Sequence, residues 1–159
     1  MAEALIARIA DGIAVALEAI TVLGGYAIDV PSVTRPVRRG IEELPATYGI
    51  ILTAESGTPA EEHSPPGNPP TAARRQQFKA LMILRVVPAA TEAFDALGFR
   101  CLSAMAKALM ADPQWAGLAI DTHLGDTAMV SADDGSFDGV ELTFEVLYRT
   151  SEQDWTSQQ

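Results

Sequence analysis

Cysteine and basic residues are both scarce in this sequence. Cys101 is the single cysteine among 159 residues, so an intrachain disulfide is impossible and no oxidising compartment is required. We therefore expect a cytoplasmic protein. Eleven Lys and Arg residues stand against 21 Asp and Glu residues, which leaves a formal charge of −10 and a pI near 4.5. This balance argues against nucleic-acid binding, because phosphate contacts need clustered Lys and Arg.

A long apolar run free of charge is also missing. The N-terminal stretch MAEALIARIADGIAVALEAITVL is apolar, but acidic and basic residues interrupt it at Glu3, Arg8, Asp11 and Glu18. A membrane span or a signal peptide is therefore not expected. Apolar residues recur every three or four positions from Leu5 to Leu23, which predicts a first amphipathic helix that ends at Gly24 and Gly25.

The remaining periodicities predict a single α+β domain with a mainly antiparallel or mixed sheet. The second amphipathic helix, which follows Pro88, has one apolar face consisting of Phe94, Leu97, Cys101, Met105 and Leu109. An arm with two prolines precedes the first strand, and the expected strands are 48–54, 78–87, 118–130 and 139–149. The strand 78–87 is nearly continuous in apolar residues, which is typical of a strand covered on both faces. Helices and antiparallel pairs in this order indicate two helices packed on one sheet.

Residues that carry chemistry are few. His63 and His123 are the only histidines, and neither has a second His or Cys at a metal-ligand spacing. Cys101 lies on the apolar face of the second helix, where we expect an inert core thiol. Gly24 and Gly25 match no nucleotide-binding pattern. No cofactor and no enzymatic activity are predicted.

One stretch of the sequence matches the spacing of a calcium-binding loop. The matching residues are Asp134, Ser136, Asp138, Gly139 and Glu145. A calcium loop of this type must be followed by a helix, whereas the residues after Gly139 alternate with period two. A hairpin turn at 133–136 between the last two strands is the preferred interpretation, because Asp and Gly favour such turns. A calcium-binding module stays as an alternative.

A proline-rich stretch separates the first two strands. It lies within a predicted protruding loop, residues 55–73, and includes the acidic cluster Glu61 and Glu62 next to His63. Long loops without core residues are usually functional, so we expect this loop to contact other molecules. A hairpin tip without any function is the alternative.

Five of the basic residues fall in two short clusters, and one large aromatic residue lies in a polar tail. The clusters are Arg35, Arg38 and Arg39, and Arg74 and Arg75. In an acidic protein they are candidates for pairing with carboxylates of a neighbouring subunit, and merely solvated basic patches are the alternative. The tail, residues 151–159, contains Trp155, which we expect to anchor on another subunit.

The order of these segments resembles the tail terminator proteins of long-tailed bacteriophages, the minor tail protein U type. The similar segments include LPATYGIIL, RRQQFKALMILRVV, ADPQWAGLAID and the closing strand GVELTFEVLYRTSEQDW. The resemblance extends from about Ala4 to Trp155. It implies a ring, typically a hexamer, that caps the tail tube, ends its polymerisation and offers a surface for joining the head. In such a ring the loop 55–73 would be an assembly loop that docks on adjoining subunits, or a loop that faces the channel.

The resemblance also implies partners and a location. The partners would be further copies of the chain, the tail tube protein and a neck or head-completion protein, with DNA passing through without specific binding. The protein would act in the host cytoplasm during assembly and then at the neck end of the virion tail. The nearest alternative is a neck or head-completion (connector) protein, because a small ring-forming α+β domain there would have much the same composition.

Overall fold

Two helices and five strands follow one another in the order expected from the sequence. The structure is a computed structural model that describes residues 4–36, 45–63, 71–84 and 92–151. Its elements are α1 (Leu5–Glu18), β1 (Val33–Thr34), β2 (Ile50–Pro59), the 3-10 helix η1 (Glu61–His63), β3 (Thr71–Leu84), α2 (Phe94–Leu109), β4 (Asp121–Ser131) and β5 (Asp138–Ser151). The predicted single α+β domain is confirmed.

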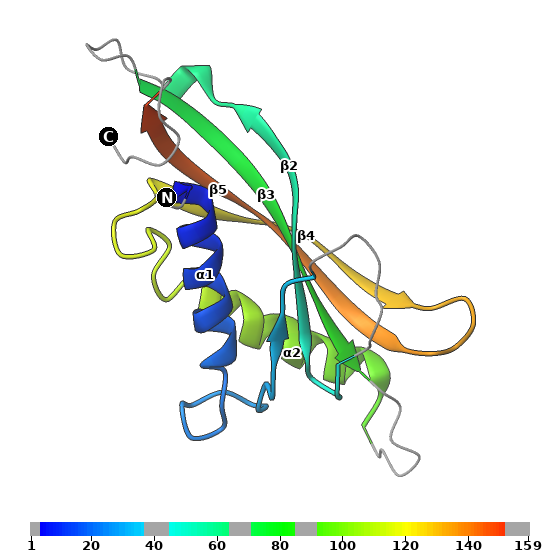
Figure 1. Cartoon of the computed structure of the whole chain (residues 1–159). Helices are drawn as coiled ribbons and strands as arrows, with labels where there is room; N and C mark the ends of the chain where they lie inside the picture. The colour runs from blue at the N-terminus through cyan, green and yellow to red at the C-terminus, as the bar shows by residue number, and fades with distance from the viewer. Residues whose placement is uncertain (1–3, 37–44, 64–70, 85–91, 152–159) are drawn as a thin grey trace.

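The five strands form one sheet in the order β1-β2-β3-β5-β4 (Figure 1). The short strand β1 runs parallel to β2, and every other neighbouring pair is antiparallel. Two prolines flank β1, and this short strand lies at one edge of the sheet, where proline is tolerated. The central pair is β3 with β5, which stay in continuous register over all 14 residues of each strand.

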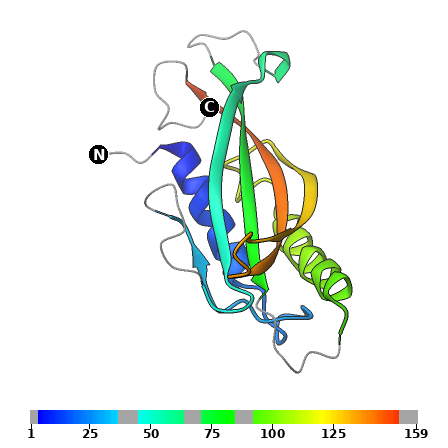
Figure 2. The same ribbon diagram turned by 90° about the vertical axis from the view of Figure 1, so that its right-hand side faces the viewer.

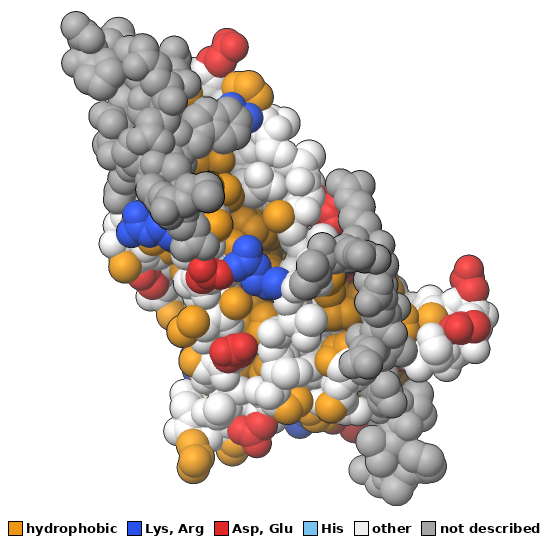
Figure 3. All heavy atoms as spheres, viewed as in Figure 1, with side chains coloured by type: hydrophobic (Ala, Val, Ile, Leu, Met, Phe, Trp, Pro, Cys, Tyr) orange, Lys and Arg blue, Asp and Glu red, His pale blue; other side chains and the backbone are white. Residues whose placement is uncertain are grey.

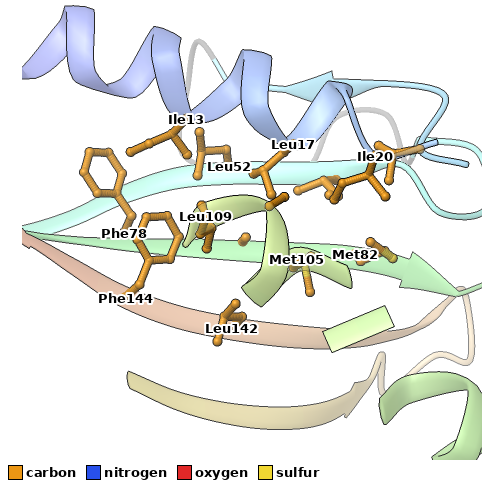
Figure 4. Close-up of a cluster of buried hydrophobic side chains, with 14 of the residues drawn as sticks. Ile13, Leu17, Ile20, Leu52, Phe78, Met82, Met105, Leu109, Leu142 and Phe144 are labelled. Carbon is orange, nitrogen blue, oxygen red and sulfur yellow. The ribbon is translucent and has the colours of Figure 1, made fainter. Parts of the chain in front are cut away.

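Both helices pack on the same face of the sheet and share one hydrophobic core (Figures 1 and 2). Within this core, the rings of Phe78 and Phe144 stack at 5.6 Å between their centroids. In Figure 4, side chains from α1, α2 and three strands converge on this face: Ile13, Leu17, Ile20, Leu52, Phe78, Met82, Met105, Leu109, Leu142 and Phe144. The opposite face of the sheet carries neither helix, so it is available for other contacts.

The alternation of β5 produces this division between two faces. The core face of β5 is fully or almost fully buried, and it consists of Val140, Leu142, Phe144, Val146 and Tyr148. On the helix-free face Glu141, Thr143 and Glu145 are half-buried. Leu147 departs from the pattern, because it is 4% exposed in a small separate cluster with Ala60 and Ala73.

Two predicted element properties need correction. The first helix ends at Glu18 rather than at the glycines, because the chain turns after Ala19 while Ile20 stays in the core and Leu23 is fully exposed. The second correction concerns β3, which is not covered on both faces over most of its length. Ile83 is buried on the helix-free face, but Lys79 and Leu81 are only half-buried there.

A hydrogen-bonded turn connects α2 to β4. Three consecutive residues have positive φ angles, namely Trp115 at 50°, Ala116 at 57° and Gly117 at 82°. The turn is held by the buried indole of Trp115, whose Nε1–H donates to Thr122 Oγ1 at 2.8 Å. The hydroxyl of Thr122 donates in turn to the carbonyl of Pro113 at 2.7 Å. These bonds fix the position where β4 enters the sheet.

Neither helix of the described segments combines the length and the hydrophobicity that crossing a bilayer requires.

Candidate functional site

The predicted loop 55–73 consists largely of regular structure. β2 continues to Pro59 and β3 already begins at Thr71, so only a short connection remains between the strands. The sequence prediction of a nineteen-residue loop is therefore wrong in its extent, and residues 64–70 lie outside the described part. Polar residues can occupy these strand ends because their side chains remain in contact with solvent. The last six residues of β2 are all exposed.

The ends of β2, β3 and β5 extend past α1 (Figures 1 and 2). We call this extension, residues 57–63, 71–76 and 147–151, the distal arm. Its strands remain paired, with Pro59 opposite Arg74 and Arg74 opposite Tyr148. Ala60, Ala73 and Leu147 form its own small cluster, with Ile120 packed against them. The distal arm is therefore an ordered projection with side-chain packing of its own.

The predicted arginine pair lies on the distal arm, on opposite faces of β3. Arg75 contacts the carboxylate of Glu62 on η1, and both side chains keep about half of their surface in water, 37% and 52% exposed. Arg74 lies beside Tyr148; burial raises the pKa of the Tyr148 hydroxyl, and the positive charge of Arg74 opposes that rise. The structure thus pairs Arg75 with Glu62 and places Glu61 beside them on the same short helix, while Arg74 lies on the other face of β3.

Arg35 lies away from the distal arm. It follows β1 and pairs with Asp11 on α1, with the two side chains 42% and 55% exposed. Thr34 lies opposite Ile51, whereas Arg74 lies opposite Pro59, eight residues further along β2. At about 3.3 Å per residue the two clusters are roughly 25 Å apart along the strand. Arg38 and Arg39 lie outside the described residues. The same holds for residues 152–159 of the predicted tail, which include Trp155.

The calcium-loop alternative is wrong in its geometry. Asp134 accepts a hydrogen bond from the backbone N–H of Ser136 at 2.9 Å, and Gly135 has a φ of 70°, as a tight turn requires. This bonding with Ser136 lowers the pKa of Asp134. The other two ligands, Asp138 and Glu145, lie on the extended strand β5, about 23 Å apart at 3.3 Å per residue. They cannot bind one ion, and the predicted hairpin turn at 133–136 is confirmed.

Metal-ligand and nucleophile candidates elsewhere are equally limited within the described segments. There, no three His, Cys, Asp or Glu side chains are grouped so that they could hold a metal ion. Cys101 is fully buried, and burial raises its pKa to about 11, so the thiolate is scarce near neutral pH. Its assignment to the core is confirmed. His123 is 63% exposed and lies 3.6 Å from Asp121.

One surface was missed by the sequence reasoning. Leu124 and Met129 on β4 are 40% and 37% exposed, and Phe99 and Met110 at α2 are 64% and 44% exposed. We call these four residues, with the outer edge of β4, the α2–β4 surface. The apolar character of Phe99 and Met110 outside the predicted apolar stripe of the second helix is the signal that could have found it.

The search of protein-family models finds no match, and no curated protein is significantly similar to the chain.

Proposed function

We propose that the protein is a non-enzymatic structural subunit that assembles into a ring, of the type that terminates the tail tube of a long-tailed bacteriophage. The ring caps the tube, ends its polymerisation and presents a surface to the neck or head-completion protein. The proposal rests on the resemblance of segment order described above. A connector protein of the neck is the second candidate, and it shares the ring architecture.

The observation that carries the proposal is the distal arm. A ring subunit needs an element that projects from its body and reaches a neighbour or the tube. The distal arm projects past the helical layer, and it is stabilised by strand pairing and by its cluster of Ala60, Ala73 and Leu147. Because it is already ordered, little conformational entropy is lost when it docks.

The charges of the distal arm are suited to an exchange of partners. The Arg75–Glu62 pair is half-exposed, so it contributes little to the stability of the subunit. In a ring, Arg75 can contact a carboxylate of the adjoining subunit while Glu62 turns to solvent or to a second arginine. The net negative charge of each copy also gives the ring an acidic character, which lets DNA pass without sticking.

The first experiment measures mass in solution by light scattering after size exclusion, across protein concentration and salt, with electron microscopy of any large species. We expect a ring, or a monomer that becomes a ring on the ends of purified tail tubes. Binding to tube ends supports a terminator, and binding to isolated necks or portals without binding to tubes supports the connector. A chain that binds neither and never forms rings would refute both.

A matched pair of variants tests the role of the arm. Arg75→Ala removes an arginine that pairs with Glu62, and Arg100→Ala removes an equally exposed arginine that pairs with Glu92 beside α2 at 2.7 Å. Both subunits should unfold at nearly the wild-type denaturant concentration. We expect ring formation or tube binding to weaken in Arg75→Ala and to be unchanged in Arg100→Ala. Equal behaviour of the two variants would remove the arm from the proposal.

A further inference from the structure

The outer edge of β4 is open. Within the described segments β4 pairs only with β5, and the seven residues from His123 to Met129 are all exposed. An edge strand of this kind presents unpaired backbone N–H and C=O groups to solvent, and proteins commonly cover or interrupt such edges. Here a bulge between Leu124 and Thr127 interrupts the pairing with β5. The bulge discourages indiscriminate pairing and leaves the edge for a partner that fits it.

Apolar side chains lie beside this open edge. Met129 lies against Gly98 of α2, where a Cβ atom on the glycine would come within 2.5 Å of the Met129 methyl group. At 3.6 residues per turn, Leu102, Ala106 and Phe99 follow one side of α2. Their exposure rises outward, from 9% for Leu102 to 64% for Phe99. The α2–β4 surface therefore combines open backbone groups with exposed apolar side chains, a combination that marks protein contacts.

A second open edge lies on the other side of the same sheet. β1 covers β2 only at Ile50 and Ile51, so the outer side of β2 from Leu52 to Pro59 has no strand beside it among the described residues. β2 and β4 run in opposite directions, because each neighbouring pair between them is antiparallel. A second copy that continued the sheet in the same orientation would thus place its β2 antiparallel to β4.

The two sides of the sheet differ in charge. Between Lys107 and Arg149 the sequence contains no Lys or Arg, so Asp and Glu supply every formal charge of β4 and of β5 up to Tyr148. Figure 3 shows acidic side chains at the tip of the β4–β5 hairpin, where Asp133 and Asp134 are exposed. The strand next to β2 carries Arg74, Arg75 and Lys79, and these basic residues offset Glu55 on β2 and Glu61 and Glu62 on η1. An acidic side repels its own copy and favours the side that carries basic residues, so identical copies meet head to tail, and head-to-tail contacts close into rings when the rotation permits.

We propose that the α2–β4 surface of one copy receives the β1-free edge of β2, Leu52–Pro59, from a second copy, so that the sheet continues from subunit to subunit. This inference rests on the proposed ring and names its interface. Leu124 and Met129 are then covered by the neighbouring strand. The bulge of β2 between Ala54 and Gly57, with the side-chain amide of Gln76 donating to the carbonyls of Glu55 and Ser56, limits the registers that fit.

Crosslinking tests the pairing of two different edges. Thr127→Cys places a thiol on β4 and Ala54→Cys places one on β2, both on the helix-bearing face of the sheet, and a short bifunctional maleimide joins thiols that are close. The wild-type chain, with Cys101 buried, is the control for background. We expect dimers when the two single variants are mixed, no crosslink in either variant alone, and a ladder up to the ring in the double variant.

The outcomes separate this interface from the ring itself. Rings seen by microscopy without any crosslinked product would overturn the interface and leave the ring intact. Self-crosslinking of Thr127→Cys alone would show a symmetric β4–β4 contact, which contradicts the proposal. A chain that stays monomeric with and without tail tubes, and that forms no ladder, would overturn the interface and the ring together.

A charge placed in the interface provides the second test. Leu124→Lys introduces a cation at a side chain that is 40% exposed at the sheet edge, and Val15→Lys makes the same change on α1, where the side chain is 65% exposed. We expect Leu124→Lys to weaken association about tenfold or more, as buried interface positions do, and Val15→Lys to leave it unchanged. Far-UV circular dichroism checks that both variants fold. Equal association of both variants would refute the interface.

Discussion

The hydroxyl of Thr122 is expected to stabilise the fold out of proportion to its size. It accepts a hydrogen bond from the indole N–H of Trp115 and donates one to the carbonyl of Pro113, and Thr122 itself is 1% exposed. Thr122→Val keeps the shape of the side chain but leaves both partners without a bond. Each unsatisfied buried group costs about 1 to 3 kcal/mol, so the variant should lose about 2 to 4 kcal/mol, less than the full sum because Pro113 is only half-buried.

The matched control for this change is Thr122→Ser. Serine retains the hydroxyl and loses one buried methyl group, which costs about 1 kcal/mol. Urea unfolding followed by circular dichroism gives both free energies, and an unchanged m value confirms that the folded and unfolded states are comparable. In a domain of this size, the valine variant should also melt about 4 to 16 °C lower. A valine variant as stable as the serine variant would refute the role assigned to the hydrogen bonds.

Three further predictions concern the turns and the buried thiol. Ala116→Gly should stabilise the protein by up to about 1 kcal/mol in urea unfolding, because the exposed Ala116 has a φ of 57°, which glycine adopts without strain; a loss of stability would contradict this account. Added calcium should leave the melting temperature unchanged in the wild type and in Asp138→Ala alike, because Asp138 and Glu145 lie far apart on β5; a shift present only in the wild type would contradict it. Cys101 should resist a thiol reagent at pH 8 until the chain is unfolded, and rapid labelling of the folded chain would exclude the buried position. The contribution of Cys101 to the free energy of unfolding should also fall as the pH rises from about 9 to about 11, because burial raises the pKa of the thiol and the unfolded thiol therefore ionises first.

The elements that the sequence predicts best are those whose burial repeats along a single strand or helix. The alternation from Val140 to Tyr148 specifies the two faces of β5 directly, and the stripe through Cys101, Met105 and Leu109 specifies the buried side of α2. Each pattern depends only on which face meets the core. The faces of these elements were therefore predictable without knowledge of their neighbours.

The errors arise where pairing or a turn decides the structure. The ends of β2 and β3 carry Glu, Ser, Gly, Arg and Gln, which predict a loop, yet they form strands because β5 pairs with β3 along its whole length. Similarly, Ile20 and Leu23 continue the helical spacing of α1, but the chain has already turned, and only Ile20 reaches the core. Local composition does not contain these long-range contacts.

The candidate site, too, could be predicted only in part from local composition. The sequence identified Glu61 and Glu62 in the loop 55–73 and Arg74 and Arg75 as a separate basic cluster, and the distal arm contains both pairs. The sequence analysis did not identify the α2–β4 surface, because the residue type of Met129 or Phe99 does not show whether the side chain is exposed or buried. The position of β4 at the margin of the sheet shows that Leu124 and Met129 lack cover, and only Phe99 and Met110 were detectable from the helical pattern.

The placement of both helices on one face has a consequence for how such a protein can change over generations. Along β5, even-numbered positions from Val140 to Tyr148 are tied to the core, while Glu141, Thr143 and Glu145 on the other face meet no helix. Mutational tolerance should therefore follow a period of two residues, which a deep mutational scan would resolve. Glu141, Thr143 and Glu145 can change more freely and adapt to a changing partner, while the even positions and the buried Leu147 preserve the fold that presents them.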